Sequence, residues 1–286
     1  MVTIEDYKSN DPIAWCPGCG NFGILAALKK ALVALDLRPQ DICMASGIGQ
    51  AAKLPHYLKG NIFNGLHGRT LSVATGIHLA NPALKVIAIG GDGDGYAEGG
   101  NHFLHALRRN PDITYIVHDN QVFGLTRGQT SPTSDQGYVS PTTPWGQIAG
   151  TFNPIAVAIA LDASFVARGF AGNIEHLSQI IQEGMRTDGF ALIDILQPCV
   201  TFNKVNTSKW YNERVYKLEE GYDPYDRTAA FSKAFELAPR IPIGVIYRGS
   251  RASYYSLLAS SRPKMKPVGY THDPSSYHSL LKDFSE

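Results

Sequence analysis

The sequence has little of what marks several large classes of protein. It contains four cysteines in 286 residues, a formal net charge of +1 and 18% charged residues. It has no run of 18 apolar residues, and residues 1–10 carry acids without an apolar core, so we expect neither a membrane span nor a signal peptide. The balanced charge and the lack of a basic, aromatic-rich stripe argue against nucleic-acid binding. We expect a soluble, cytoplasmic protein.

The few cysteines and the low charge are informative in themselves. Four cysteines in such a chain favour metal or redox chemistry over disulfides. A hydrophobic content of 44% is ample for a folded core, and the low share of charged residues suits a protein with much of its surface buried in an assembly. No internal repeat or low-complexity tract occurs.

Residues 85–130 have the pattern of one βαβ unit. The apolar run 86–89, bounded by glycines, predicts a buried strand. Residues 98–109 predict a helix, which ends before Pro111 because the residue preceding a proline disfavours the helical conformation. A second apolar run, 113–117, predicts a parallel strand.

An acid or an amide follows each of these strands where it ends. Asp92 comes after the first strand and Asn120 after the second, and the carboxyl ends of parallel strands share the edge where open α/β sheets bind ligands. Together with a loop carbonyl such as that of Val122, they offer the all-oxygen ligand set that suits Mg²⁺. Gly91 and Gly93 let backbone N–H groups approach a diphosphate.

Two other interpretations of the Gly-Asp-Gly-Asp-Gly run at 91–95 are disfavoured. An EF-hand calcium loop needs a helix on both sides and an acid at its twelfth position, whereas a strand is expected before this run. A dinucleotide-binding loop needs the register G-x-G-x-x-G and an acid roughly 20 residues later. The sequence GGDGDG does not keep that register and places acids where a pyrophosphate would lie. A metal-bridged diphosphate is therefore favoured.

The same residues resemble a known cofactor signature. Gly-Asp-Gly followed by 25 residues and Asp-Asn is similar to the thiamine-diphosphate motif, and GGDGDGYAEGGNHF…VHDNQVFGLTRGQ resembles the β subunit of 2-oxoacid:ferredoxin oxidoreductases. The resemblance implies a doubly wound, mostly parallel α/β sheet of the diphosphate-binding type. It also implies oxidative decarboxylation of a 2-oxoacid to its acyl-CoA, with electrons passing through a [4Fe–4S] cluster to ferredoxin.

The resemblance also assigns residues to the cofactor and the substrate. They follow the ends of the predicted strands 41–45 and 61–66 and of the two strands described above. The expected cofactor contacts are Ser46, Gly47, Ile48, Gly49, His67, Gly68, Gly91, Gly93, Asp94, Gly124 and Leu125. The expected magnesium ligands are Asp92, Asn120 and the carbonyl of Val122. Lys53 is expected to meet the substrate carboxylate, although without the family it would be interpreted as a solvated helix lysine.

The cysteines suggest a metal centre. Cys16 and Cys19 form a C-x-x-C pair, which alone fits zinc, an iron–sulfur cluster or a redox pair; a polar arm precedes it, which disfavours the thioredoxin-like option. The resemblance implies a [4Fe–4S] cluster bound by this pair and Cys199. The family has its remaining cysteine where this chain has Gln50, so we name Cys43 as the candidate fourth ligand. A small buried hydrophobe is an equal interpretation of Cys43, and zinc is the alternative metal.

The chain is expected to divide near residue 200. In residues 1–200, further strands at 164–168 and 190–196, alternating with helices, should extend the parallel sheet. Residues 201–286 are expected to form a C-terminal arm that packs on a partner subunit, with a helix at 228–237 and an apolar run at 241–247.

The chain lacks room for the second domain that thiamine-diphosphate enzymes of this family need. The glutamate that activates the cofactor belongs to a pyrimidine-binding domain in the family, so we expect an α-type partner subunit that carries it. SGIGQAAKLPHY and GLHGRTL resemble 2-oxoglutarate enzymes more than pyruvate enzymes. Pyruvate and branched-chain 2-oxoacids stay open as substrates. So do a non-redox thiamine-diphosphate decarboxylase or synthase subunit with zinc or structural cysteines, and a non-catalytic partner.

Overall fold

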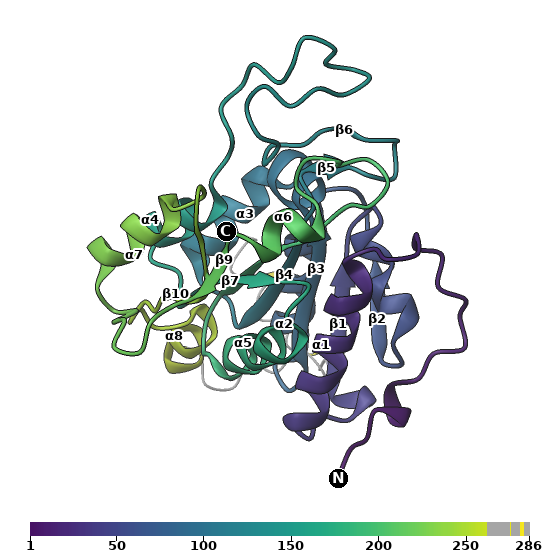
Figure 1. Cartoon of the computed structure of the whole chain (residues 1–286). Coiled ribbons are helices and arrows are strands. Elements are labelled where there is room, and N and C mark those ends of the chain that lie inside the picture. Colours follow the sequence, from purple (N-terminus) through teal and green to yellow (C-terminus); the bar gives the residue numbers. More distant parts are fainter. Residues whose placement is uncertain (262–274, 276–280, 283–286) are drawn as a thin grey trace.

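An eight-stranded sheet forms the centre of the molecule in the computed structural model, which describes residues 1–261, 275 and 281–282 (Figure 1). The strand order is β2-β1-β3-β4-β8-β7-β10-β9, and the first six strands are parallel. β10 is antiparallel to β7, and β9 is parallel to β10. The strands are β1 (Ile42–Ser46), β2 (Asn61–Asn64), β3 (Lys85–Gly91), β4 (Ile113–Asp119), β7 (Phe165–Phe170), β8 (Ala191–Leu196), β9 (Val215–Lys217) and β10 (Ile241–Tyr247). The mostly parallel α/β fold predicted from the sequence is confirmed.

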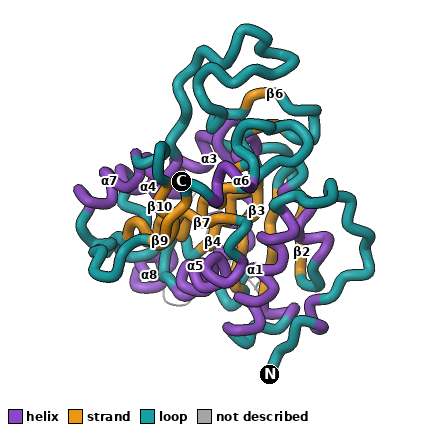
Figure 2. The backbone as a smooth tube through the Cα atoms, viewed as in Figure 1, coloured by secondary structure: helices purple, strands orange, loops and turns teal. Residues whose placement is uncertain are grey.

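Helices cover both faces of this sheet (Figure 2). α1 (Asn21–Ala34) and α5 (Ile174–Arg186) bury one face in a shared core. The opposite face packs on α2 (Thr70–Ala80), α3 (Gly100–Arg109), α4 (Pro154–Ala160) and α7 (Arg227–Phe235). Every residue of β4 and of β8 is buried, which explains why most residues of these strands are apolar.

Shorter elements complete the fold. Two further helices are α6 (Ser208–Asn212) and α8 (Tyr254–Ser261), and β5 (Val122–Phe123) pairs with β6 (Gln129–Thr130) in a separate two-stranded ladder. Turns of 3-10 helix lie at Glu5–Tyr7, Pro39–Asp41 and Ala51–Tyr57, and a π-helical turn spans Gly93–Glu98. That turn connects β3 to α3 and was not predicted from the sequence.

The end of α3 shows how the sequence sets a boundary. Asn110 follows the helix in the left-handed conformation, with φ of 57°, and Pro111 prevents a further turn. The Asn110 side chain is buried and donates to Ser164 Oγ at 2.9 Å, while its Oδ1 accepts from Phe190 N at 2.8 Å. The predicted stop is therefore correct, and the same asparagine ties α3 to the starts of β7 and β8.

The C-terminal region differs from the expected arm in its described part. β9 and β10 join the central sheet, and α7 packs on α4, so residues 208–261 are integrated into the α/β fold. The rest of the expected arm, at 262–274, 276–280 and 283–286, lies outside the described residues. Packing of this region on a partner subunit stays a prediction. Among the described residues, no helix is long and apolar enough to cross a membrane.

The strand order creates a ligand site between β1 and β3. From β1 the chain moves to β2 on one side, and it later enters β3 on the other side. At such a reversal the loops after the two strands diverge and leave a crevice at the carboxyl edge of the sheet. The turn after β1 and the Gly-Asp-Gly turn after β3 both border this crevice.

Candidate cofactor site

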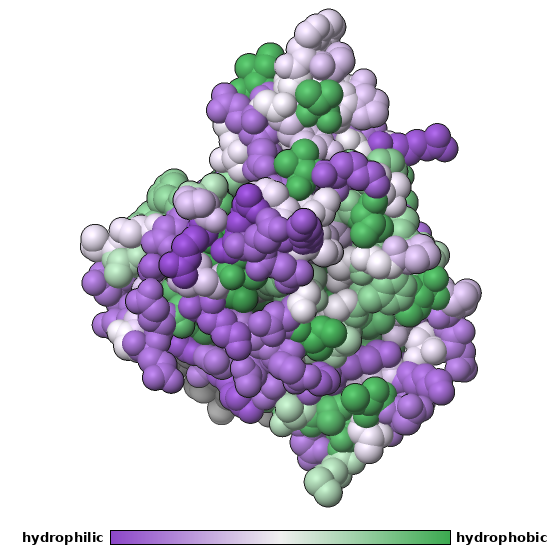
Figure 3. Space-filling model, in the orientation of Figure 1, coloured by the Kyte–Doolittle hydropathy of each residue, from purple (hydrophilic) through white to green (hydrophobic). Residues whose placement is uncertain are grey.

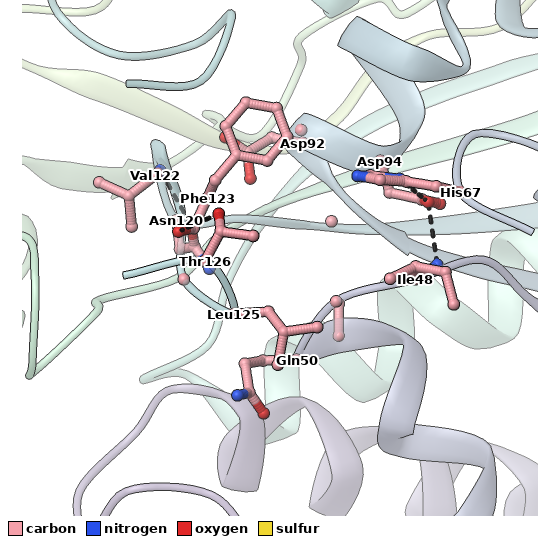
Figure 4. A pocket seen from close by; sticks show the side chains of 15 residues that line it. Ile48, Gln50, His67, Asp92, Asp94, Asn120, Val122, Phe123, Leu125 and Thr126 are labelled. Atoms are coloured by element: carbon pink, nitrogen blue, oxygen red, sulfur yellow. Dashed lines mark hydrogen bonds and ion pairs between the residues drawn. The ribbon is translucent and has the colours of Figure 1, made fainter. Parts of the chain in front are cut away.

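A hollow of about 500 Å³ lies at the carboxyl ends of β1, β3 and β4 (Figure 4). It brings together most of the predicted cofactor and magnesium residues. Its walls are formed by Ile48, Gly49, Gln50, Ala51, His67, Gly91, Asp92, Gly93, Asp94, Asn120, Val122, Phe123, Gly124, Leu125 and Thr126. Of the residues predicted to contact the cofactor or the substrate, four lie outside that lining set: Ser46, Gly47, Lys53 and Gly68.

Asp92 is held in the wall of this hollow by hydroxyl groups from a later loop. Its carboxylate is 1% exposed and its Oδ2 accepts from Ser131 Oγ and, at 2.7 Å, from Thr133 Oγ1. The Thr133 hydroxyl also lies 2.7 Å from Asp119 Oδ1, which joins the tips of β3 and β4. Burial raises the pKa of Asp92. A cation at this point would favour the charged carboxylate.

Asn120 and Val122 lie at the neighbouring strand tip. Asn120 Oδ1 accepts from Val122 N at 3.0 Å in a local turn, and Val122 is 2% exposed. In Asp119, burial and the nearby charges of Asp194 and Asp92 raise the pKa. The donor set facing the hollow is a carboxylate and an amide oxygen beside backbone carbonyls, so its chemistry fits Mg²⁺.

Asp94 links three loops around the hollow. Its Oδ1 accepts from Ile48 N at 3.0 Å and from Gly68 N at 2.8 Å, and it pairs with His67 Nδ1 at 2.7 Å. Its Oδ2 accepts from Thr70 Oγ1 at 3.0 Å. Figure 4 shows the contacts with Ile48 and His67 as dashed lines. Asp94 therefore fixes the turn after β1 and the loop before α2 against β3.

Several glycines are required here for packing. A Cβ on Gly47 would lie 2.2 Å from Asp94 Oδ2, and a Cβ on Gly95 would lie 2.0 Å from the Tyr115 hydroxyl. A Cβ on Gly93 would lie 2.4 Å from the Phe123 ring. The glycines were expected to admit a diphosphate, and the structure adds that they let the loops pack against each other.

A second hollow, of about 440 Å³, adjoins the first and contains three of the cysteines. Cys16, Cys19 and Cys199 line it, although the last lies 180 residues or more from the other two in the chain. Gln50 and Asn120 line both hollows, so the cysteines lie directly beside the candidate cofactor pocket. In the described part of the chain, no group of three His, Cys, Asp or Glu side chains has the geometry of a site for one metal ion.

Each of the three sulfur atoms accepts a hydrogen bond. The contacts are Thr201 Oγ1 to Cys16 Sγ at 3.1 Å, Gln197 Nε2 to Cys19 Sγ at 3.3 Å and Phe202 N to Cys199 Sγ at 3.5 Å. Burial raises the pKa of the Cys19 thiol, and the neighbouring Cys199 and Cys16 raise it further. Donors aimed at several clustered sulfurs fit an iron–sulfur cluster, whose potential depends on such contacts.

Cys43 is separate from this group, contrary to its suggested role as fourth ligand. It is the second residue of β1, pairs with Asn61 and Val86, and is 7% exposed. Side chains alternate between the faces of a strand, and its neighbour Met44 packs in the α1–α5 core. Cys43 therefore points to the opposite face of the sheet from that core, and it does not line the cysteine hollow.

Lys53 lies in the 3-10 turn Ala51–Tyr57 and is half-buried. Within the described part of the chain it lines neither hollow, so its expected role at the substrate carboxylate stays a prediction. Ser131 and Thr133, which hold Asp92, were not predicted from the sequence. The signal that could have indicated them is the density of hydroxyl residues in the long loop that follows Asn120.

Comparison with known families agrees with this geometry. Residues 43–195 match the family described as "Thiamine pyrophosphate enzyme, C-terminal TPP binding domain", and thiamine pyrophosphate is another name for thiamine diphosphate. The fold and the site thus define the diphosphate-binding domain of a thiamine-diphosphate enzyme. Residues 199–262 match the family described as the C-terminal part of the pyruvate ferredoxin oxidoreductase beta subunit.

The relatives identify the family more closely. The chain is 44% identical over 261 residues to the 2-oxoacid:ferredoxin oxidoreductase subunit beta of Saccharolobus solfataricus, covering 87% of this chain and 86% of that protein. It is 39% identical to the 2-oxoglutarate oxidoreductase subunit KorB of Mycobacterium tuberculosis, over 76% of this chain and 59% of that one. The chain belongs to the β subunits of 2-oxoacid:ferredoxin oxidoreductases. It is thus a subunit of an oxidoreductase that acts with a partner.

A solved structure has the same fold over nearly the whole chain. It is the 2-oxoglutarate:ferredoxin oxidoreductase from Magnetococcus marinus with 2-oxoglutarate, coenzyme A and succinyl-CoA bound. The TM-score is 0.91 at 36% identity, and the match covers 98% of this chain and 96% of that one. The similarity therefore includes the C-terminal strands β9 and β10.

Proposed function

We propose that this chain is the β subunit of an enzyme that oxidatively decarboxylates 2-oxoglutarate to its acyl-CoA and passes the electrons through a [4Fe–4S] cluster to ferredoxin. The observation that carries the proposal is the pair of adjoining hollows, one lined by Asp92, Asn120 and Val122 and one lined by three cysteines. Several relatives are named for 2-oxoglutarate, and the structural relative binds 2-oxoglutarate and coenzyme A.

The residues of the first hollow would bind and orient the cofactor. Asp92, Asn120 and the carbonyl of Val122 would hold Mg²⁺ against the diphosphate, and Asp94 would keep the surrounding loops in place. Bound thiamine diphosphate supplies a carbanion that adds to the keto carbon of the substrate and an electron sink for the loss of CO₂. Lys53 is proposed to meet the carboxylate of the 2-oxoacid.

The residues of the second hollow would carry the electrons away. Cys16, Cys19 and Cys199 would bind the cluster. Because Gln50 and Asn120 border both hollows, electrons leaving the cofactor would need to cross only this shared wall to reach the cluster. Four thiols without a disulfide in the structure suit a reducing compartment, and a cytoplasmic location is part of this proposal.

We further propose that the partner is an α-type subunit with the pyrimidine-binding domain. Apolar side chains beside the cofactor hollow support this, because Ile48 and Leu125 are 36% and 46% exposed and Leu66 is 75% exposed. A partner that closes over the hollow would cover them and would supply the activating glutamate. Figure 3 shows hydrophobic side chains exposed on the projecting upper part of the molecule as well.

The first test is Asp92→Asn in the reconstituted complex of both subunits. The amide can still accept from Ser131 and Thr133, so the loop contacts persist, but the carboxylate ligand of Mg²⁺ is lost. We expect the affinity for thiamine diphosphate with Mg²⁺ to fall by at least about 10-fold in titration calorimetry. Asp188→Asn, an exposed change just before β8 at the opposite edge of the sheet, is the control. Unchanged affinity in Asp92→Asn would contradict the proposal.

The second test compares substrates. The complex should reduce ferredoxin fastest with 2-oxoglutarate, and the reaction should require coenzyme A. A preference for pyruvate or for branched-chain 2-oxoacids would show that 2-oxoglutarate is not the substrate, while the reaction type would stay as proposed. Decarboxylation without ferredoxin reduction, in a preparation that holds zinc, would instead favour the non-redox alternative.

A further inference from the structure

Three cysteine sulfurs line the cysteine hollow. A [4Fe–4S] cluster needs a ligand for each of its four irons, so the other polar side chains that line the hollow are candidates for the fourth ligand. Among the residues that line it, two amide oxygens are buried without a hydrogen-bond partner: Gln50 Oε1 and Gln197 Oε1. Unpaired buried amide oxygens cost free energy unless a donor or a cation reaches them. The amide of Gln197 already has a role, since its nitrogen donates to Cys19 Sγ.

Gln50 occupies the wall that separates the two hollows. It lines both of them, and Figure 4 shows its amide group turned away from Asp92 and Asn120. Its backbone is fixed, because the indole Nε1 of Trp15 donates to the Gln50 carbonyl at 2.9 Å, and Trp15 lies one residue before Cys16. The Gln50 side chain is thus positioned beside the cysteines by the segment that carries the C-x-x-C pair.

The fourth cysteine of the chain cannot take this place. Cys43 lies within β1 and its side chain is on the face of the sheet opposite the α1–α5 core. An amide oxygen is a neutral ligand and is harder than a thiolate, so an iron atom bound by it would be held less tightly than the three thiolate-bound irons.

We propose that Gln50 Oε1 is the fourth protein ligand of a [4Fe–4S] cluster whose other irons are bound by Cys16, Cys19 and Cys199. This inference rests on the proposed function, which supplies the cluster. It adds that one corner, on the side of the cofactor hollow, is bound by an amide oxygen and is therefore the labile corner. An oxidant removes one electron from such a cluster, and its amide-bound iron leaves as Fe²⁺, which gives [3Fe–4S]⁺.

The experiment uses the anaerobically purified complex of both subunits, with iron analysis, Mössbauer spectra and electron paramagnetic resonance. Wild type should hold four irons per cluster and lose one on mild ferricyanide oxidation, with the signal of a three-iron cluster. Gln50→Leu removes the ligand at similar volume, so it should lose the fourth iron at a lower ferricyanide concentration than wild type does. Gln50→Cys should keep four irons and resist the oxidant.

Thr201→Val is the matched control in the same hollow. It removes the hydroxyl that donates to Cys16 Sγ at 3.1 Å and leaves Gln50 unchanged, so it should shift the midpoint potential without changing the iron count. Two results would overturn the inference: a four-iron cluster in Gln50→Leu as stable as that of wild type, or a three-iron cluster already present in anaerobic wild type. A wild-type complex without iron would instead refute the cluster in the proposed function.

Discussion

At the scale of single residues, the chemistry of the chain depends on which polar atoms are already paired. Asp94 has both carboxylate oxygens engaged by neighbouring loops, so it organises the hollow. Asp92 is held by hydroxyl groups that a metal-bound carboxylate can keep as partners. Two adjacent acids of one Gly-Asp-Gly-Asp-Gly run thus have different tasks, and their hydrogen bonds distinguish them where their sequence context does not.

Cys43 gives a clear test at this scale. Because burial raises the pKa of its thiol and the side chain is 7% exposed, it should react slowly with iodoacetamide at pH 8 in the folded protein.

Cys43→Ala should leave the iron content of the complex unchanged. Cys199→Ala should lower the iron content sharply. Loss of iron in Cys43→Ala would show that this cysteine reaches the cluster.

At the scale of elements, strand tips and turns build the site. The predicted strands after which Asp92 and Asn120 follow are present as β3 and β4, and the predicted helix 98–109 is present as α3, Gly100–Arg109. These elements were predictable because each is a long periodic or apolar segment with a glycine, asparagine or proline at its end.

The parts that were not predicted depend on contacts between distant segments. The π-helical turn Gly93–Glu98 is shaped by Asp94 bridging to loops more than 20 residues away. The approach of Ser131 and Thr133 to Asp92 comes from the folding of a long loop whose sequence has no periodicity. β9 and β10 were missed as sheet strands because their position at the sheet edge depends on β7.

Gly47→Ala tests the turn after β1. The new Cβ would lie 2.2 Å from Asp94 Oδ2, so Asp94 must move and its contacts with the neighbouring loops must weaken. We expect the affinity of the complex for thiamine diphosphate to fall by about 10-fold, because positioning contacts of a metal site typically contribute 10–100-fold. Calorimetric titration measures this.

The matched control is Gly76→Ala within α2. Nothing lies within 4 Å of a Cβ at this position, and alanine is the better helix former. It should leave cofactor affinity unchanged and raise the free energy of unfolding by about 0.5–1 kcal/mol. Equal cofactor affinities in both variants would contradict the role given to the turn.

β4 also carries a pH-sensitive side chain. Burial lowers the pKa of His118 to about 3, whereas the unfolded value is about 6.5. Between these two pKa values the unfolded chain gains a proton at His118 and the native chain does not. The contribution of His118 to the free energy of unfolding is therefore fully present above about pH 6.5 and is lost as the pH falls toward 3. The loss from this group between pH 7 and pH 5 is about 2 kcal/mol.

His118→Gln should reduce this acid sensitivity. The glutamine amide can donate to Asn21 Oδ1, which lies 2.7 Å from His118 Nδ1, and it does not titrate. Urea unfolding at pH 7 and pH 5 should show a difference smaller by about 2 kcal/mol in the variant than in wild type. His105→Gln, on the exposed side of α3, should behave as wild type. If the free energy of unfolding falls by the same amount between pH 7 and pH 5 in all three proteins, His118 is protonated in the native state.

At the scale of the whole molecule, the structure has the features of one part of a larger assembly. A segment between β6 and α4 projects beyond the sheet (Figure 1). Its ends are joined by hydrogen bonds from Gly137 N to Gln147 O at 2.8 Å and from Gln147 N to Tyr138 O at 2.9 Å. Tyr138 OH donates to Phe202 O at 2.9 Å, which anchors the projection beside the cysteine hollow.

The projection presents apolar side chains that a partner can cover. Trp145 is 94% exposed and Ile148 is 86% exposed. Tryptophan is enriched among the residues that contribute most to protein interfaces, where its truncation often costs about 2 kcal/mol or more. Since the chain belongs to a family of subunits, and since Tyr138 anchors this segment beside the cysteine hollow, we expect the α-type partner to bind it.

Trp145→Ala should therefore weaken assembly and leave the chain folded. The side chain contributes little to the core, so the free energy of unfolding of the purified chain should change by less than about 0.5 kcal/mol. The dissociation constant with the α-type subunit, measured by calorimetry or analytical ultracentrifugation, should rise by about 30-fold, which corresponds to about 2 kcal/mol. Phe235→Ala is the control, because Phe235 is 65% exposed at the end of α7, away from the projection. If both variants assemble as wild type does, the partner binds elsewhere on the molecule, and the exposed apolar residues around the cofactor hollow become the next surface to test.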